Sequence, residues 1–415
     1  MSRYLLYFFC CWAPWVIGEE KSGQEIDSLD SLRTFIEVYE HVKKDYVKKI
    51  DDETLLNQAI SGMLSKLDPH SAYMEPGDVS SLRESTSGSF GGIGIEMDVV
   101  DGLIEVISPI DDSPASRAGI LAKDIITHVN GDLVKNISLQ KAIETLRGQI
   151  GAKIEIQLLR QVEGKAQELT ISLERAVIRL TSVRKEMLPH NIGYLRISQF
   201  QSRTSLDLIK AISSLKSENN LNGIILDLRN NPGGVLSAAI EVTDAFINKG
   251  VIVSTKGRED FLDTKYEATE STVLDNEPIV VIINGGSASA AEIVAGALQD
   301  HERAILIGTP SFGKGSVQTI LTLKNDYALK LTTALYYTPS GRSIQATGIL
   351  PTITIAAGKT LIEPSPGIRE SDLPKHIRNK DDADLPNEKF IGRLTEDNQL
   401  FYAYNLLRGS QLLNP

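Results

Sequence analysis

The spacing of apolar positions changes sharply near residue 284. Residues 279–283 are consecutive β-branched residues, a pattern typical of a strand buried on both faces. Between residues 288 and 298 the apolar positions recur instead at helical spacing. The pattern therefore predicts a strand, a turn rich in glycine and serine, and a helix that begins near Ser287 and Ser289.

Similar patterns predict a mixed α/β body around this turn. Buried strands and amphipathic helices alternate along the chain, as they do in a parallel α/β sheet. The strands are expected over residues 192–197, 223–228, 304–308 and, half-buried, 327–337, and the helices over 205–217 and 236–247.

Both ends of the chain carry further helical patterns. Two amphipathic helices are expected between residues 27 and 67, with a break at 48–52, and a third over 397–407. The first two cannot cover their apolar faces alone, so we expect them to pack on the body or on a second subunit. The third helix is a candidate partner for them across a dimer.

A short apolar run follows the single positive charge at Arg3. It extends over residues 4–17, which is short for a membrane span and suits a signal peptide or N-terminal anchor within residues 1–20. No clear small-residue cleavage site follows, so a retained amphipathic or buried segment is the alternative. Both cysteines, Cys10 and Cys11, lie in this run, so a processed chain would have neither disulfides nor a thiolate metal site.

Composition restricts the classes of partner. The 415 residues allow two or three domains, and 41% hydrophobic with 23% charged residues is ordinary for a soluble globular protein. The net charge of −11, without a basic block, argues against nucleic acid or anionic membranes as partners.

A serine at a helix N-terminus and a lysine in a glycine-rich loop are the main candidates for chemistry. Unpaired N–H groups and the helix dipole favour negative charge beside Ser289. Lys314 lies between two glycines just after the strand at 304–308. Burial there would lower the pKa of its amine, which could then act as a general base toward a hydroxyl. The alternative is that the serines only cap the helix.

These residues resemble the carboxy-terminal processing, or tail-specific, proteases. The resemblance rests on the string from Ser287 to Ile293 with Lys314 and Gln318 at the spacing of that family. It implies that Ser289 is the nucleophile, Lys314 the base and Gln318 the residue that orients the lysine. Ala291 departs from the pattern, since many members have a third serine there, but this is not a catalytic position.

Two other chemistries compete for the same stretch. Residues 308–314 match most of a phosphate-binding P-loop, but Gly315 stands where magnesium coordination requires serine or threonine. A Ser-His-Asp triad with His301 lacks the Gly-x-Ser-x-Gly elbow.

A second resemblance covers residues 88–176. The turn at 91–97, the segments at 113–120 and 124–131, and a helix from Ser138 follow the order found in PDZ domains. The resemblance implies a site for a peptide carboxylate and a groove for its side chains. We place the carboxylate at Ile93, Gly94 and Ile95 and the groove at Leu139, Ile143 and Leu146. Lys123 stands where glycine is usual, and the alternative is a small β-barrel that only spaces its neighbours.

A glycine pair after the strand at 223–228 is a candidate for transition-state stabilisation. Glycines that open a helix bring backbone N–H groups close to a substrate carbonyl. By the resemblance, this loop forms the oxyanion hole, so we nominate Gly233 and Gly234 with the N–H of Ala290. Glu292 and Asp300 are supporting candidates, and an ordinary Pro-Gly turn is the alternative.

The predicted organisation is therefore an α/β, crotonase-like protease core interrupted by a PDZ domain, with helical N- and C-terminal regions. The expected parts are residues 27–78 (helical), 88–176 (PDZ), 177–357 (core) and 358–415, where 358–390 is a solvated excursion before a terminal helix. The expected function is a serine endopeptidase with a Ser-Lys dyad, and the alternative is a non-catalytic PDZ scaffold.

The resemblance also sets expectations for partners and location. No metal or organic cofactor is expected. Substrates are expected to be proteins with apolar, uncharged C-terminal tails, in the periplasm or cell envelope. A homo-oligomer, a tetratricopeptide adaptor and a peptidoglycan hydrolase are candidate partners, and nucleic acid is not.

Overall fold

The computed structural model describes residues 23–413 except 136–137, 163, 219, 260–262, 275, 361–372 and 376–387. The expected leader at 1–20 and most of the expected excursion at 358–390 lie outside these residues. The chain divides into two compact units, residues 1–69 and 70–415. Within the described part, no helix is both long and apolar enough to cross a membrane.

The first unit contains two helices, α1 (Gly23–Asp45) and α2 (Asp52–Leu64). Asp51 caps α2 by accepting the N–H of Thr54 at 2.8 Å, and Lys43 pairs with Asp52 at 2.8 Å. The helical prediction for this region is confirmed, with the break close to its expected place. Apolar side chains of α1 such as Phe35 and Ile36 are exposed, as expected for helices that cannot cover their own apolar faces.

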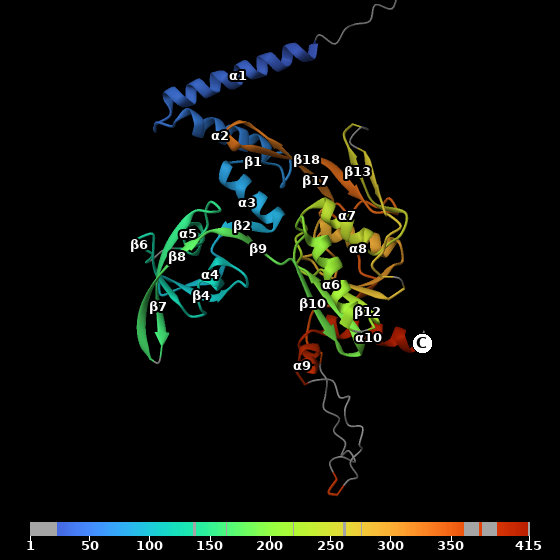
Figure 1. Ribbon diagram of the computed structural model, residues 1–415. Coiled ribbons are helices and arrows are strands. Elements are labelled where there is room, and N and C mark those ends of the chain that lie inside the picture. Colours follow the sequence, from blue (N-terminus) through green and yellow to red (C-terminus); the bar gives the residue numbers. More distant parts are fainter. Residues whose placement is uncertain are drawn as a thin grey trace, which may run out of the picture. The chain divides into compact units, whose positions relative to one another are not determined.

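The second unit is built on a six-stranded sheet (Figure 1). Its strands, in spatial order, are β10 (Val183–Leu188), β11 (Ile192–Ile197), β12 (Gly223–Asp227), β15 (Ile279–Ile283), β16 (Ala304–Gly308) and β19 (Ile353–Thr354). All neighbours are parallel except β10 and β11. The parallel sheet predicted from the sequence is therefore confirmed.

Helices cover both faces of this sheet. Alternate strand residues such as Leu226 and Val281 pack on one side, and Ile225 and Val280 on the other. The first side is covered by α6 (Thr204–Glu218), α7 (Leu236–Asp244) and α8 (Ala290–Asp300), and the second by α9 (Glu388–Glu396) and α10 (Asn398–Leu413). The buried apolar side chains of α10 thus pack on its own sheet, and a pairing of α10 with the N-terminal helices across a dimer stays a prediction.

A second sheet is connected to the loop of Lys314. It has the order β1 (Ala72–Met74), β18 (Ala328–Tyr337), β13 (Val251–Gly257) and β14 (Thr264–Glu267), and β17 (Ser316–Thr322) also pairs with β18. The β17–β18 hairpin begins directly after Gly315, so it fixes the end of the loop that carries Lys314.

Residues 89–179 form an inserted domain with its own apolar core. Its sheet contains β3 (Ile95–Val100), β4 (Leu103–Pro109), β5 (Ile125–Val129), β6 (Asp132–Leu133), β7 (Lys153–Val162) and β8 (Lys165–Glu174), with helices α4 (Pro114–Arg117) and α5 (Leu139–Leu146). Lys123 adopts a φ of 70°, so the tight turn is kept although a lysine stands where glycine is usual.

The chain enters and leaves this domain through two paired strands. Helix α3 (Pro76–Ser87) ends at Gly88 and is followed by β2 (Ser89–Gly92), which pairs antiparallel with β9 (Ala176–Arg179). The N–H of Leu180 then donates to the carbonyl of Gly88 at 2.9 Å. We call β2 and β9 together the ribbon.

Candidate active site

The candidate residues lie in three loops at the carboxyl ends of β12, β15 and β16. The loops cover residues 228–235, 284–289 and 309–315. Because these strands are parallel neighbours, their following loops meet at one edge of the sheet. This edge is the usual place for a binding site in an open α/β sheet.

Ser289 occupies a strained position at the start of α8. It is the N-cap residue of the helix, with φ 54° and ψ −112°. Such a backbone costs on the order of 1–3 kcal/mol for a residue other than glycine. A strained serine between a strand and a helix is also the geometry of the nucleophile elbow, here without the Gly-x-Ser-x-Gly motif. The strain marks Ser289 as a functional candidate.

Ser287 has a different role. It is fully buried, and its hydroxyl donates to the carbonyl of Leu228 at 2.8 Å while accepting the N–H of Asn284 at 3.0 Å. These bonds tie the turn after β15 to the end of β12. Ser287 therefore stabilises the turn that presents Ser289.

The carboxylate of Glu292 connects the serine turn to the lysine loop. Its Oε2 accepts the N–H of Ser289 at 2.7 Å and the N–H of Lys314 at 2.9 Å. Its Oε1 accepts the N–H of Gly313 at 2.7 Å and the hydroxyl of Ser311. The carboxylate is fully buried, so these donors replace its hydration. One oxygen of Glu292 therefore bonds the backbone N–H groups of both Ser289 and Lys314, which holds the two backbones close together.

The loop of Lys314 is also held from its other side. Gly315 donates its N–H to Oε1 of Gln345 at 2.9 Å and accepts the N–H of Tyr336 at 2.6 Å. Lys314 itself is half-buried. Gln318 lies on β17, where its Nε2 donates to Ser316 at 2.9 Å and to Thr332 at 3.3 Å. Its amide is therefore fixed within the β17–β18 hairpin.

The glycine loop approaches Ser289 closely. A Cβ atom on Gly233, which has φ 98°, would lie 2.8 Å from Cβ of Ser289 and 3.0 Å from the nitrogen of Ala290. Only glycine fits this position. The N–H of Gly233 donates to Oδ1 of Asn231 at 2.9 Å, whereas the N–H groups of Gly234 and Ala290 have no acceptor among the described residues.

Tyr336 is a site residue that sequence reasoning missed. Its phenol is buried and lies within hydrogen-bonding reach of the Ser289 side chain. Burial raises the pKa of Tyr336 to about 12, and the contact with Ser289 opposes this rise only in part. The phenol is consequently neutral at ordinary pH. The alternating pattern over 327–337 indicates a half-buried strand, but nothing in it distinguishes this tyrosine from its neighbours.

Asp300 and Arg342 belong to the other end of α8. Asp300 accepts the N–H of Ser340 at 2.9 Å and lies 3.8 Å from the guanidinium of Arg342. Ser289 begins this 11-residue helix, which is about 16 Å long. Asp300 is therefore outside the site. In the part of the chain that the structure describes, no group of three or more His, Cys, Asp or Glu side chains is arranged to hold a metal ion.

The inserted domain contains an apolar groove of about 280 Å³. Five of the predicted peptide-binding residues line it, namely Ile93, Gly94, Ile95, Ile143 and Leu146. The side chain of Leu139 lies outside the described residues. Phe90 and Arg147 also line the groove, and the guanidinium of Arg147 stacks 4.2 Å from the Phe90 ring while pairing with Glu84 at 2.7 Å. Neither residue is predicted from the sequence, because Phe90 comes from the ribbon and Arg147 follows the end of α5.

Three family models match successive parts of the chain. Residues 16–77 match the model described as the activating protease CtpB N-terminal domain, residues 91–173 match the PDZ domain, and residues 191–355 match peptidase family S41. The PDZ match falls on the inserted domain, and the S41 match contains all three site loops.

Similar proteins are found along most of the chain. A carboxy-terminal-processing protease from Bartonella bacilliformis is 46% identical over 398 residues, which is 94% of this chain and 91% of that protein. The carboxy-terminal processing protease CtpA of Bacillus subtilis is 37% identical over 346 residues, or 81% and 71%. Among solved structures, the photosystem II D1 C-terminal processing protease is 27% identical, covers 81% of this chain and 94% of that one, and has a TM-score of 0.47.

Proposed function

Because the chain belongs to peptidase family S41, as a C-terminal processing serine peptidase with a PDZ domain, we propose that Ser289 is its nucleophile and Lys314 its general base. The main support is the shared Glu292 oxygen, which holds the backbones of both residues beside a strained serine turn. Gln318 is assigned the role of orienting the amine of Lys314 from the adjoining hairpin.

The reaction proceeds by acyl transfer. Ser289 Oγ attacks the scissile carbonyl while the neutral amine of Lys314 takes the hydroxyl proton. The resulting oxyanion accepts hydrogen bonds from backbone N–H groups. Because Gly233 donates to Asn231, the donors in this proposal are Gly234 and Ala290, and Gly233 serves by allowing the close approach. Lys314 then gives the proton to the leaving amine, and water hydrolyses the acyl-enzyme by the same steps.

We assign the core to the crotonase-like group of folds and the substrates to proteins with apolar, uncharged C-terminal tails. The apolar PDZ groove supports such tails. The apolar run at residues 4–17 supports an exported protein of the periplasm or envelope, and the exposed apolar face of α1 supports a homo-oligomer. A tetratricopeptide adaptor rests on the resemblance alone.

Tail dependence tests this function. A loosely folded reporter that ends in Leu-Ala-Ala is expected to be cleaved about tenfold faster, in kcat/KM at low substrate, than the same reporter that ends in Asp-Asp. The reason is that groove binding raises the local concentration of scissile bonds at Ser289. Equal cleavage of both reporters contradicts tail recognition, whereas binding without cleavage of either one matches a scaffold instead.

The pH profile tests the proposed base. Raising the pH removes the proton from Lys314, so kcat/KM is expected to rise with pH and then level off once the amine is neutral. Tyr336 does not contribute between about pH 6 and 10, because burial raises its pKa to about 12. The same profile is expected with and without EDTA. A rate that falls across this range, or that is abolished by the chelator, contradicts the dyad.

A further inference from the structure

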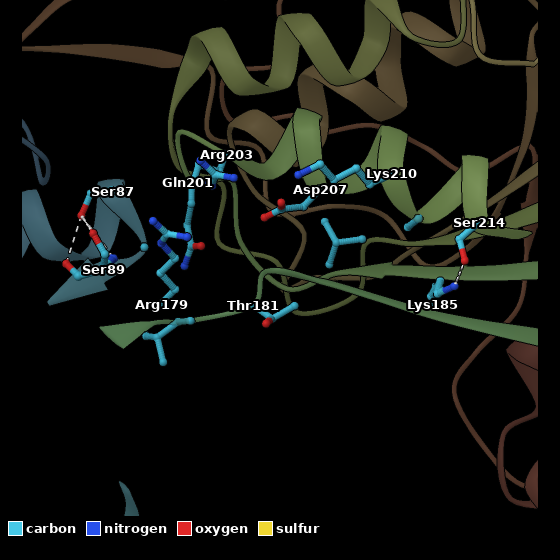
Figure 2. A pocket seen from close by; sticks show the side chains of 14 residues that line it. Ser87, Ser89, Arg179, Thr181, Lys185, Gln201, Arg203, Asp207, Lys210 and Ser214 are labelled. Carbon is cyan, nitrogen blue, oxygen red and sulfur yellow. Dashed lines mark hydrogen bonds between the residues drawn. The ribbon is translucent and has the colours of Figure 1, made fainter. Parts of the chain in front are cut away.

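A pocket of about 490 Å³, lined mainly by polar and charged residues, lies at the base of the ribbon, away from the site loops and next to the PDZ groove, with which it shares Leu180. Figure 2 shows the side chains that line it. Arg179 comes from β9 in the ribbon, Gln201 and Arg203 from the segment before α6, and Asp207 and Lys210 from α6 itself. The pocket therefore joins the exit from the inserted domain to the first helix of the core.

The charged side chains of this pocket are largely uncompensated. Arg179, Arg203 and Lys210 carry three positive charges, and Asp207 is the acidic residue that lines the pocket with them. Within the described ranges, none of these four side chains forms an ion pair or hydrogen bond. Lys185 at the far edge differs. Its amine donates to the hydroxyl of Ser214 and to the carboxylate of Glu218 at 3.2 Å, so its charge is already paired.

Gln201 provides a second and independent indication of a ligand. Its side chain is only 7% exposed, yet its amide has no hydrogen-bond partner among the described residues. The amide is pressed against Gly88, where a Cβ atom would lie 2.1 Å from Oε1. Because this amide lies in the pocket wall without a partner among the described side chains, it can donate to and accept from a ligand there.

We propose that this pocket binds a short acidic peptide segment, whose carboxylate is held by Arg203, Lys210 and Arg179. Guanidinium groups match the planar geometry of a carboxylate. The concentration of positive charge is notable because the whole chain has a net charge of −11. A carboxylate in this pocket meets an attractive field that most of the surface does not provide.

Two features favour a peptide over a simple anion. Asp207 would repel a bare anion but accepts hydrogen bonds from peptide N–H groups. The amide of Gln201 and hydroxyls such as those of Ser87 and Thr181 supply further donors and acceptors. The pocket volume lies in the range of small-molecule sites, about 300–1,000 Å³, and a few residues fill such a space. A bound segment would connect Arg179 on the ribbon to Lys210 on α6.

Calorimetric titration of the full chain carrying Ser289→Ala, which prevents turnover, tests the proposal. The probes are acetyl-Ala-Glu-Ala-amide, its neutral isostere acetyl-Ala-Gln-Ala-amide, and glutarate. None has a peptide C-terminal carboxylate, the group for which the PDZ site is built. The Glu peptide is expected to bind at least about tenfold more tightly than the Gln peptide, as expected for one charge-assisted contact.

Matched variants locate the binding. Arg203→Gln and Lys210→Gln are each expected to weaken the Glu peptide about tenfold. Arg184→Gln removes the same charge from β10 but does not line the pocket, and it is expected to change binding less than twofold. An equal loss in all three variants, or no heat with the Glu peptide, overturns the site. Glutarate that binds as tightly as the Glu peptide overturns the assignment of a peptide ligand.

Discussion

Replacing Ser289 with alanine is expected to lower kcat/KM for a tailed reporter by roughly 1,000-fold or more, while the protein stays folded. The loss is large because the substitution removes the atom that forms the acyl-enzyme, and single losses from a nucleophile–base unit reach this size. The substitution removes the contact with Tyr336, but the Glu292 bond to residue 289 uses the backbone N–H and is kept, so the loss of stability is expected to be modest. The measurement is reporter cleavage alongside a thermal melt.

Ser287→Ala is the matched control. It removes a hydroxyl two residues away that bonds Leu228 and Asn284 inside the protein, so it is expected to cost about 1–3 kcal/mol of stability. Once folded, this variant still presents Ser289 and is expected to cleave the reporter. If Ser287→Ala abolishes cleavage in folded protein and Ser289→Ala does not, the nucleophile has been assigned to the wrong serine.

Glu292→Gln is expected to lower kcat by about 100-fold, although the residue touches no substrate in the proposed mechanism. Both carboxylate oxygens accept hydrogen bonds, from Ser289 and Lys314 on one side and from Gly313 and Ser311 on the other. An amide offers one oxygen and places an N–H₂ against N–H donors, which separates the two loops. A displacement of about 1 Å at the reacting groups is enough for a loss of this size.

Two readouts distinguish this positioning role from a general loss of stability. Kinetics are measured well below the melting temperature, where the variant is folded, and KM is expected to change much less than kcat. Glu302→Gln makes the same substitution at an exposed residue just beyond the other end of α8, and its activity is expected to equal that of the parent. A kcat for Glu292→Gln within threefold of the parent would rule out the positioning role.

Local patterns were sufficient to predict much of the core. The β-branched run at 279–283 and the helical spacing after it predict β15, α8 and the turn of Ser289, because a short buried strand and a small-residue helix leave clear periodic signals. The resemblance to carboxy-terminal processing proteases and to PDZ domains is confirmed by the family models and relatives.

The remainder depended on contacts between distant segments. Tyr336 reaches Ser289 from a strand much later in the chain, and Gly233 approaches Ser289 closely from a loop much earlier in the chain. Glu292 was a supporting candidate from the sequence, but its link between two loops depends on how β15 and β16 lie side by side. Periodicity describes one segment at a time, and these features require several segments to be placed together.

The pairing of β2 with β9 has a consequence for protein engineering. Gly92 lies opposite Ala176, so the inserted domain is attached at two adjacent points of the backbone. A two-residue reverse turn between these positions would close the ribbon as a hairpin, with the same first and last strands. The recognition module can therefore be exchanged for another PDZ domain whose ends are similarly close, which offers a route to redirecting the choice of substrate without altering the hydrolytic residues.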